Sequence, residues 1–410
     1  MMLGLLMACG LEAANAQGGD GALRKIELTC VDADATGYGT FQSHNQKVVS
    51  NASGIFMTHL RSRNDAYTAQ QWRLSRSQDG GETFETVWEE TNATNPATLE
   101  TDEAGNIYLI RPDFGDHNAY LYLFLAENDY SDPTIHTIPG GSAGKFAAMY
   151  DPGRKQLYWL AHHGQLSTLT LNGEVTRATH LLKAGSNAGV MYPFLYLEPS
   201  GVLHAAWTTQ QHGLYMYRSI HHMLSDDGGE TWRTMDGTPL APPVVADDSG
   251  PSTMVSLRDE FDAHTFLSGF LCKRGKAHFA YMAQLQARRE HYIRYDVATG
   301  KREIDTGAEF KGEEISLMGL DGFFATDSDD PDSPLYFVGL WGDRLGCLES
   351  RDNGDTWHDY GASGPAGNIY AIGGAREITE DGYVIGSFTD SPAGGVGEGR
   401  VHFLRIKVRE

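Results

Sequence analysis

The chain has 410 residues, of which 40% are hydrophobic and 10% aromatic, and its formal net charge at pH 7 is −22. This acidic balance excludes nucleic acid as an expected partner, because binding to phosphates needs a basic face. No stretch approaches the roughly 18 consecutive apolar residues of a membrane span, so none is expected.

The first sixteen residues are typical of a secretory signal peptide. An apolar run over residues 3–8 is followed by an A-x-A cleavage signal at residues 14–16. We therefore expect residues 1–16 to be removed and the protein to be secreted or periplasmic. An alternative is a lipid anchor, because residues 6–9 (Leu-Met-Ala-Cys) resemble a bacterial lipoprotein box that would attach the chain through Cys9.

A short pattern in which turn residues lead into an apolar strand recurs along the rest of the chain. The seven occurrences lie at residues 52–59, 104–111, 153–162, 199–207, 274–281, 332–341 and 380–388. Their spacing of roughly 50 residues is the size of a four-stranded propeller blade. The last repeat lacks one strand, which residues 24–31 could supply by pairing with it. The sequence therefore predicts an all-β, seven-bladed β-propeller over residues 22–410 as one domain, with six blades as the alternative.

A second pattern, S-x-D-x-G-x-T-W/F, occurs at residues 77–84, 225–232 and 350–357. Each copy follows an apolar strand and precedes another, so it predicts a hairpin turn. An Asp in such a turn can accept bonds from nearby backbone N–H groups, and Gly supplies positive φ. We therefore interpret Asp79, Asp227 and Asp352 as structural.

This pattern resembles the Asp-box, or BNR repeat, of sialidase-like β-propellers. The resemblance implies the same fold, and it implies that the three boxes lie away from the active face. It does not specify a reaction.

In a propeller, the starts of the first strands and the ends of the second strands surround one mouth of the central channel. Cationic, imidazole and aromatic side chains are predicted there. They are His44, Asn45, His59, Arg61, Arg111, Lys145, His162, His163, Tyr192, Trp207 and Trp341. Such a mouth suits an anionic sugar, because Arg or Lys pairs with a carboxylate or sulfate while aromatic rings stack on the sugar.

One reaction that fits an anionic sugar is β-elimination beside a uronic acid. This reaction needs a cation for the carboxylate, a base for the C5 proton and an acid for the leaving oxygen. The candidate cations are Arg61, Arg111 and Lys145. The candidate bases are His44, His59 and His162, and Tyr192 is the candidate acid or base. Asn45, His163, Trp207 and Trp341 are expected to bind substrate.

Two short stretches are similar to BNR-type propeller lyases, including ulvan lyases and rhamnose–glucuronate lyases. Residues 41–62 resemble their H-N…G-x-x-x-x-H stretch, which carries His44 and His59 as candidate catalytic or binding residues. Met191-Tyr192-Pro193-Phe194 is similar to their Tyr-Pro phrase and carries Tyr192. The resemblance implies a polysaccharide lyase acting on an acidic polysaccharide, such as a sulfated or rhamnose-containing one.

Two alternatives remain. A sialidase-like exo-glycoside hydrolase would need an arginine triad, but the Phe-Arg-Ile-Pro phrase expected in sialidases does not occur, and residues 110–112 are the nearest fragment. A non-catalytic glycan-binding propeller would keep the aromatic rings without a proton-transfer set. In each case the expected partner is an anionic polysaccharide or oligosaccharide, and the chain is expected to act as a monomer.

No cofactor is predicted to be required. The acidic residues 327–332 could hold a structural Ca²⁺ ion, but they lack the spacing of an EF-hand loop and are more typical of a solvated turn. Cys30, Cys272 and Cys347 allow at most one disulfide, and no C-x-x-C or other zinc spacing occurs, so no metal ligand is predicted.

Overall fold

The computed structural model describes residues 22–410 except 43, 67–68, 92, 94, 186–187, 214–215, 248–252, 285–287, 307–308, 311–312, 315–321, 329 and 393–396. The predicted signal peptide over residues 1–16 and the alternative anchor at Cys9 lie outside this part of the chain. Within the described part, no helix is both long and apolar enough to cross a membrane.

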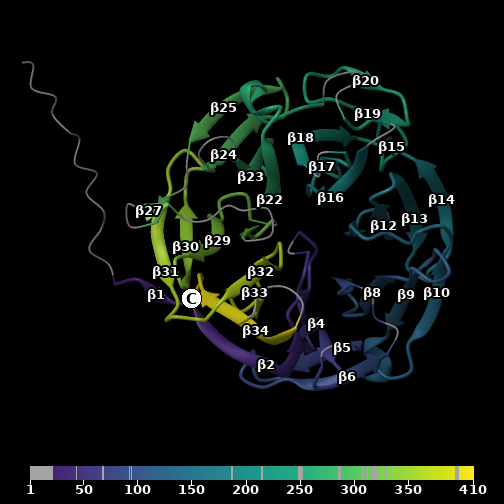
Figure 1. Ribbon diagram of the computed structural model, residues 1–410, viewed down its shortest axis with the longest axis vertical. Helices are drawn as coiled ribbons and strands as arrows, with labels where there is room; N and C mark the ends of the chain where they lie inside the picture. Colours follow the sequence, from purple (N-terminus) through teal and green to yellow (C-terminus); the bar gives the residue numbers. More distant parts are fainter. Residues whose placement is uncertain are drawn as a thin grey trace, which may run out of the picture.

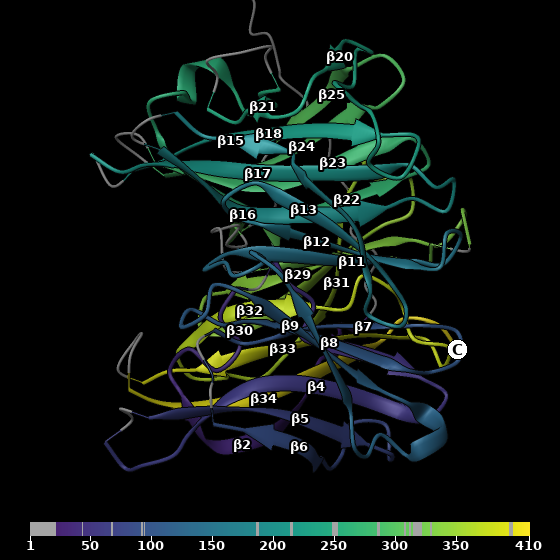
Figure 2. The same ribbon diagram turned by 90° about the vertical axis from the view of Figure 1, so that its right-hand side faces the viewer.

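The strands are arranged as blades around a central axis (Figure 1). Seen from the side, the strands of each blade run between the two faces of the ring (Figure 2). The described strands fall into seven consecutive groups of at least four strands, and neighbours within a group are mostly antiparallel. The prediction of an all-β propeller is confirmed.

The first four groups follow one another in chain order. Blade one contains β3 (Val48–Asn51), β4 (Gly54–Ser62), β5 (Gln70–Ser77) and β6 (Glu85–Glu90). Blade two contains β7 (Thr98–Thr101), β8 (Ile107–Pro112), β9 (Ala119–Phe124) and β10 (Thr134–Ile138), with the 3-10 helix η1 (Ala126–Asn128). Blade three contains β11 (Phe146–Asp151), β12 (Gln156–Ala161), β13 (Gln165–Thr170) and β14 (Val175–His180). Blade four contains β16 (Ala188–Leu197), β17 (Leu203–Gln211), β18 (Met216–Ser225), β19 (Trp232–Arg233) and β20 (Pro239–Leu240).

The remaining groups complete the ring. Blade five contains β22 (His264–Lys273), β23 (Lys276–Gln284), β24 (Arg288–Asp296) and β25 (Lys301–Thr306). Blade six contains β28 (Phe323–Ala325), β29 (Leu335–Trp341), β30 (Arg344–Ser350) and β31 (His358–Ala362). Blade seven contains β32 (Ile369–Gly374), β33 (Tyr383–Asp390), β34 (Glu398–Lys407) and the N-terminal β2 (Glu27–Thr36). Smaller elements are β15 (Leu182–Lys183), β21 (Val244–Val245), β26 (Glu309–Phe310), β27 (Glu313–Glu314) and the 3-10 helix η2 (Arg258–Glu260).

The N-terminal segment joins the ends of the ring. Its first strand, β1 (Arg24–Lys25), runs parallel to β31 of blade six. β2 then pairs antiparallel with β34 from Glu27 opposite Arg405 onward, and Ala35 also pairs with Arg61 of β4 in blade one. The predicted pairing of the N-terminal strand with the last blade is therefore present, and it covers the edge of β34.

Hydrophobic side chains pack between neighbouring blades rather than within one central core. For example, Phe56, Trp72 and Leu74 of blade one pack with Leu99 and Leu109 of blade two in a single buried cluster. Similar clusters join the other neighbouring blades. Burial of each apolar strand face thus depends on the next blade, as in other repeat architectures.

The three Asp-boxes form hairpin turns with the same hydrogen bonds. In the second box, Asp227 accepts bonds from the Thr231 backbone N–H at 2.9 Å, the Thr231 hydroxyl at 2.6 Å and the Ser225 hydroxyl at 2.8 Å. Asp79 and Asp352 accept the equivalent bonds in the other boxes. These bonds support the structural interpretation of the three aspartates.

Candidate active site at the channel mouth

Three of the predicted site residues lie together at the mouth of the channel. They are His44, Lys145 and Tyr192, which we call the mouth cluster. The ring of His44 meets that of Tyr192 edge-on, with centroids 5.3 Å apart. The Lys145 ammonium lies 5.3 Å from the centre of the Tyr192 ring and 4.5 Å from that of Phe41. These side chains come from blades one, three and four, so the cluster depends on the packing of separate blades.

The loop before β3 is held across the mouth by polar contacts. Gln42 donates to the Gly144 carbonyl oxygen at 2.6 Å, and the buried Lys47 ammonium donates to the Gln42 carbonyl oxygen at 3.2 Å. On the other side, His162 Nδ1 accepts a bond from the Gly144 N–H at 3.0 Å. His162 therefore positions the backbone that carries Lys145.

Burial and positive charge keep the imidazoles of the mouth neutral. The pKa of His44 lies well below its ordinary value, first because the ring is buried and then because Lys47 and Lys145 are near. Burial, followed by the nearby His163 and Lys145, lowers the pKa of His162 to about 4. Burial lowers the pKa of Lys145 to about 8, so this ammonium is charged at neutral pH but close to titration.

The hydrogen bond of His44 fixes which nitrogen carries the proton. Its Nε2 lies 3.1 Å from the Phe146 carbonyl oxygen, which can only accept, so Nε2 carries hydrogen and donates it. In a neutral ring, Nδ1 then bears the lone pair. Nδ1 is buried and has no hydrogen-bond partner among the described residues. A base with an unused lone pair beside a phenol is suited to proton transfer.

Tyr192 occupies an irregular backbone position. Its φ is 45°, in the left-handed region, and the pairing of β16 with β17 shifts between Met191 and Phe194. Such a bulge redirects a side chain away from the regular alternation of the strand. The bulge points the Tyr192 ring at His44 and Lys145.

Several predicted site residues lie outside the mouth cluster. His59 and Arg61 both contact the buried carboxylate of Asp32, at 3.1 Å and 2.7 Å, and Arg61 also pairs with Asp34. Arg111 pairs with Asp113 at 3.2 Å and donates to the Tyr122 hydroxyl. The expectation that Arg61 and Arg111 are available to an anionic sugar is therefore not supported by the geometry, because each already pairs with a carboxylate.

The predicted aromatic platforms also differ from expectation. Trp207 has no exposed surface, and its indole N–H donates to the Ala246 carbonyl oxygen at 3.1 Å, so it cannot stack on a sugar in this structure. Trp341 is half-buried and lies under the Arg344 guanidinium. Asn45 is buried and donates to Gln42, while His163 is exposed next to His162.

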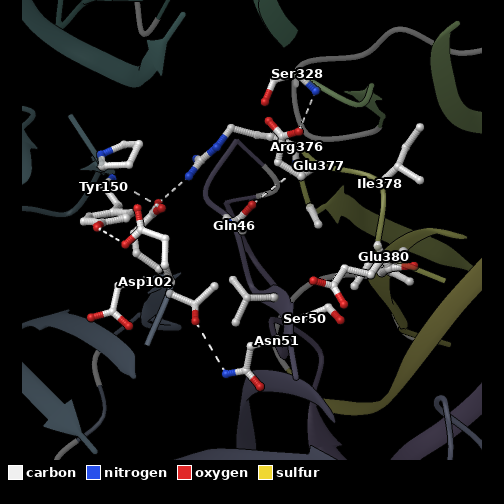
Figure 3. A pocket seen from close by; sticks show the side chains of 18 of the residues that line it. Gln46, Ser50, Asn51, Asp102, Tyr150, Ser328, Arg376, Glu377, Ile378 and Glu380 are labelled. Carbon is white, nitrogen blue, oxygen red and sulfur yellow. Dashed lines mark hydrogen bonds and ion pairs between the residues drawn. The ribbon is translucent and has the colours of Figure 1, made fainter. Parts of the chain in front are cut away.

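A cavity of about 1410 Å³ lies at the opposite end, on the Asp-box side. Its walls are the turns after the first strands of blades one to four, together with residues 375–381 (Figure 3). Arg376 pairs there with the buried Glu100, and its backbone N–H donates to Gln46 at 3.1 Å. The sequence patterns did not predict this cavity, because its walls come from separate blades.

No family model matches the chain, and no curated relative matches it. Among solved structures, an ulvan lyase of polysaccharide lyase family PL25 aligns with a TM-score of 0.63 at 11% identity, covering 92% of this chain and 95% of that one. The same type of lyase bound to -[GlcA(1-4)Rha3S]- aligns with a TM-score of 0.64 at 12% identity over the same shares. The polysaccharide lyase Uly1 aligns at 0.57 and 13%, covering 89% and 90%.

At these identities the likeness concerns the fold. The chain has a β-propeller fold similar to that of the ulvan lyases, as the sequence patterns led us to expect.

Proposed function

We propose that this protein is a carbohydrate-active enzyme that cleaves an acidic polysaccharide by β-elimination next to a uronic acid. The observation that carries the proposal is Lys145. Among the described residues no carboxylate lies within ion-pair distance of this half-buried ammonium, which contacts the rings of Phe41 and Tyr192. An uncompensated cation in a partly desolvated mouth favours an anionic ligand. The ulvan lyases of similar fold, one bound to a glucuronate-containing saccharide, support this substrate class.

In the proposed reaction, the Lys145 ammonium pairs with the uronate carboxylate. This pairing stabilises the negative charge that develops on the carboxylate when the C5 proton leaves. The C5–H electron pair becomes the C4–C5 double bond. The C4–O bond breaks, its electron pair goes to the leaving oxygen, and that oxygen takes up a proton.

The two proton transfers are assigned to His44 and Tyr192. His44 is neutral and carries an unused lone pair on Nδ1, while the phenol of Tyr192 can give or take a proton. Because Nδ1 is covered in this structure, the base role of His44 requires the neighbouring Tyr192 ring to move as the sugar binds. His162 is a positioning residue, since it holds the backbone next to Lys145.

The test is ultraviolet absorbance during incubation with a panel of uronate polysaccharides, because only elimination creates the absorbing unsaturated uronate. Wild type should produce the signal, and Tyr192→Phe and His44→Ala should lose it. The matched controls are Tyr120→Phe and His180→Ala, which change a half-buried and an exposed residue outside the mouth cluster and should retain it. A fluorogenic sialoside assayed in parallel separates the hydrolase alternative: cleavage of the sialoside without absorbance change would overturn the proposal. Silence in both assays across the whole panel would also count against it and favour a binding propeller.

A further inference from the structure

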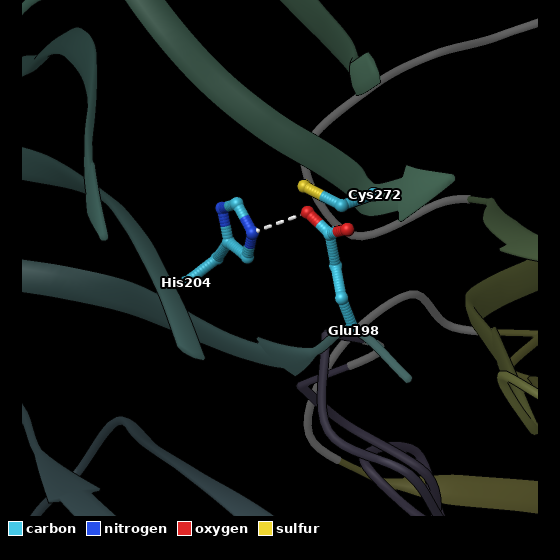
Figure 4. A group of neighbouring side chains, drawn as sticks. All are labelled: Glu198, His204 and Cys272. Atoms are coloured by element: carbon cyan, nitrogen blue, oxygen red, sulfur yellow. Dashed lines mark hydrogen bonds and ion pairs between the residues drawn. The ribbon is translucent and has the colours of Figure 1, made fainter. Parts of the chain in front are cut away.

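Three side chains with different ligand atoms meet between blades four and five. They are Glu198, His204 and Cys272 (Figure 4). One ligand atom of each lies within 4.8 Å of the other two, and His204 Nε2 is 2.8 Å from Glu198 Oε1. His204 and Cys272 are almost completely buried, at 0% and 1% exposed.

The three residues reach this place from different strands. Glu198 directly follows β16, His204 lies near the start of β17, and Cys272 lies near the end of β22 in the next blade. Their positions in the sequence follow no zinc spacing, which explains why the sequence predicted no metal ligand. Only the packing of blade four against blade five brings them together.

This ligand set suits one ion in particular. Thiolate, imidazole and carboxylate together are ligands of Zn²⁺, whereas Ca²⁺ and Mg²⁺ select oxygen atoms only. A zinc ion bound at about 2.0–2.3 Å holds tetrahedral ligand atoms roughly 3.3–3.8 Å apart, so the present His204–Glu198 distance would lengthen by less than about 1 Å. One thiolate and one carboxylate also balance the charge of a divalent ion.

The surroundings of His204 match those of a zinc-bound histidine. Its other nitrogen, Nδ1, lies 3.0 Å from Nε2 of the buried His222. A proton on Nδ1 that is donated to His222 leaves the Nε2 lone pair pointing at Glu198 and Cys272. Metal-bound histidines commonly have such an outer hydrogen-bond partner, which fixes the ring orientation. Phe270 and Phe279 pack against the His222 ring and shield the site.

The site is also accessible from one side. Glu198 lines the cavity at the Asp-box end, and its side chain is 12% exposed. We propose that Glu198, His204 and Cys272 form a Zn²⁺ site that links blade four to blade five, with the fourth coordination position open to this cavity. The ion lies at the end of β16 opposite to Tyr192, so its main effect is on stability and not on the proposed elimination.

The experiment uses the full chain, freed of metal with a chelator and then titrated with Zn²⁺ by calorimetry and with Co²⁺ by absorption spectroscopy. A cobalt–thiolate charge-transfer band reports coordination by cysteine. Wild type should bind one equivalent of either ion, show the band, and melt at a higher temperature with zinc. Cys272→Ser should lose the band, and the pair Cys272→Ser/His204→Ala should bind zinc at least about tenfold more weakly.

Cys347→Ser is the matched control, because Cys347 is equally buried but lies in β30, where its thiol contacts the Leu348 carbonyl oxygen and no metal-ligand cluster is found among the described residues. This variant should behave as wild type. The proposal is overturned if folded wild type binds less than one equivalent of zinc, or if the thiolate band persists in Cys272→Ser, which retains the exposed Cys30. If Cys272→Ser does not fold, the zinc stoichiometry of wild type and the presence or absence of the cobalt–thiolate band in wild type still test the proposal.

Discussion

The two ends of the channel differ in whether their charged side chains are paired with an opposite charge. At the Asp-box end, Glu100 pairs with Arg376, and Lys155 pairs with Glu103 at 2.8 Å. At the mouth, Lys145 faces aromatic rings and neutral imidazoles instead of a carboxylate. Charges that are compensated within the fold stabilise it, while a desolvated charge without a counter-ion is typical of a ligand site. The comparison of Lys145 with Lys155 is therefore the most direct test of the proposed function.

The largest effect is expected for Lys145→Met. If the ammonium stabilises the transition state, this change should lower kcat/KM for elimination about 10²–10³-fold without lowering the melting temperature. The measurement is steady-state kinetics on the uronate polysaccharide that wild type cleaves. If the loss of kcat/KM were accompanied by a lower melting temperature, the result would contradict a catalytic role for Lys145 and indicate a structural one.

The pH dependence should show the same lysine. Because the pKa of Lys145 is lowered to about 8, kcat/KM should fall as pH rises through about 8, by about tenfold per pH unit. Lys145→Arg, if active, should move this decline to higher pH because a guanidinium stays charged. An unchanged alkaline decline in Lys145→Arg would assign the titration to another group.

The same lysine affects the pH dependence of stability. Between pH 8 and the ordinary value of 10.5, Lys145 is protonated in the unfolded chain but not in the folded one. Its deprotonation in the folded state therefore makes the free energy of unfolding rise with pH in this range.

At the Asp-box end, substitutions should change stability and not activity. Burial alone would raise the pKa of Asp227, but hydrogen bonds from Thr231 and Ser225 lower it to about 2. Asp227→Asn should therefore reduce the free energy of unfolding by about 1–2 kcal/mol at neutral pH. The contribution is present above the ordinary pKa of 3.8 and is lost as pH falls towards 2, so denaturant titrations of wild type and variant should converge in acid.

Asp226→Asn is the control for that change, since Asp226 lies in the same turn but accepts bonds only from the partly exposed Arg233 among the contacts described. It should cost less than Asp227→Asn. A loss of elimination activity in Asp227→Asn at a temperature where the variant is folded would contradict the separation of the two ends.

The smallest effect is expected for Lys155→Met. Both partners of the Lys155–Glu103 pair are more than half exposed, so the change should alter the free energy of unfolding by less than about 1 kcal/mol. It should leave kcat/KM unchanged, which makes it the matched control for Lys145→Met. A reduction in kcat/KM similar to that of Lys145→Met would show that general charge, not position at the mouth, governs activity.

The fold could be predicted from the sequence because its signals are local. Each Asp-box contains its own turn-forming hydrogen bonds, and each blade repeats the change from turn residues to apolar strand. Part of the site was also predictable, since His44, Lys145 and Tyr192 all lie near the starts of first strands. Their position along the strand was enough to place them at one end of the ring.

The rest of the site depends on where side chains point, which strand position does not specify. Trp207 lies on the predicted strand but turns into the packing between blades, and Arg61 turns towards Asp32 of the N-terminal strand. Lys47, which holds the mouth loop, and the Arg376–Glu100 pair were missed, because their partners belong to other segments or blades. Contacts between repeats leave no regular spacing in a sequence.

The pairing of β2 with β34 joins two segments from opposite ends of the described chain. These strands are joined by Arg405 and Glu27, which are 378 residues apart in the chain. A ribosome synthesises β2 before the blades and β34 after them, so the pairing of these two strands can form only when the last blade has been made. Contacts of such long sequence separation form slowly and leave strand edges exposed in the meantime.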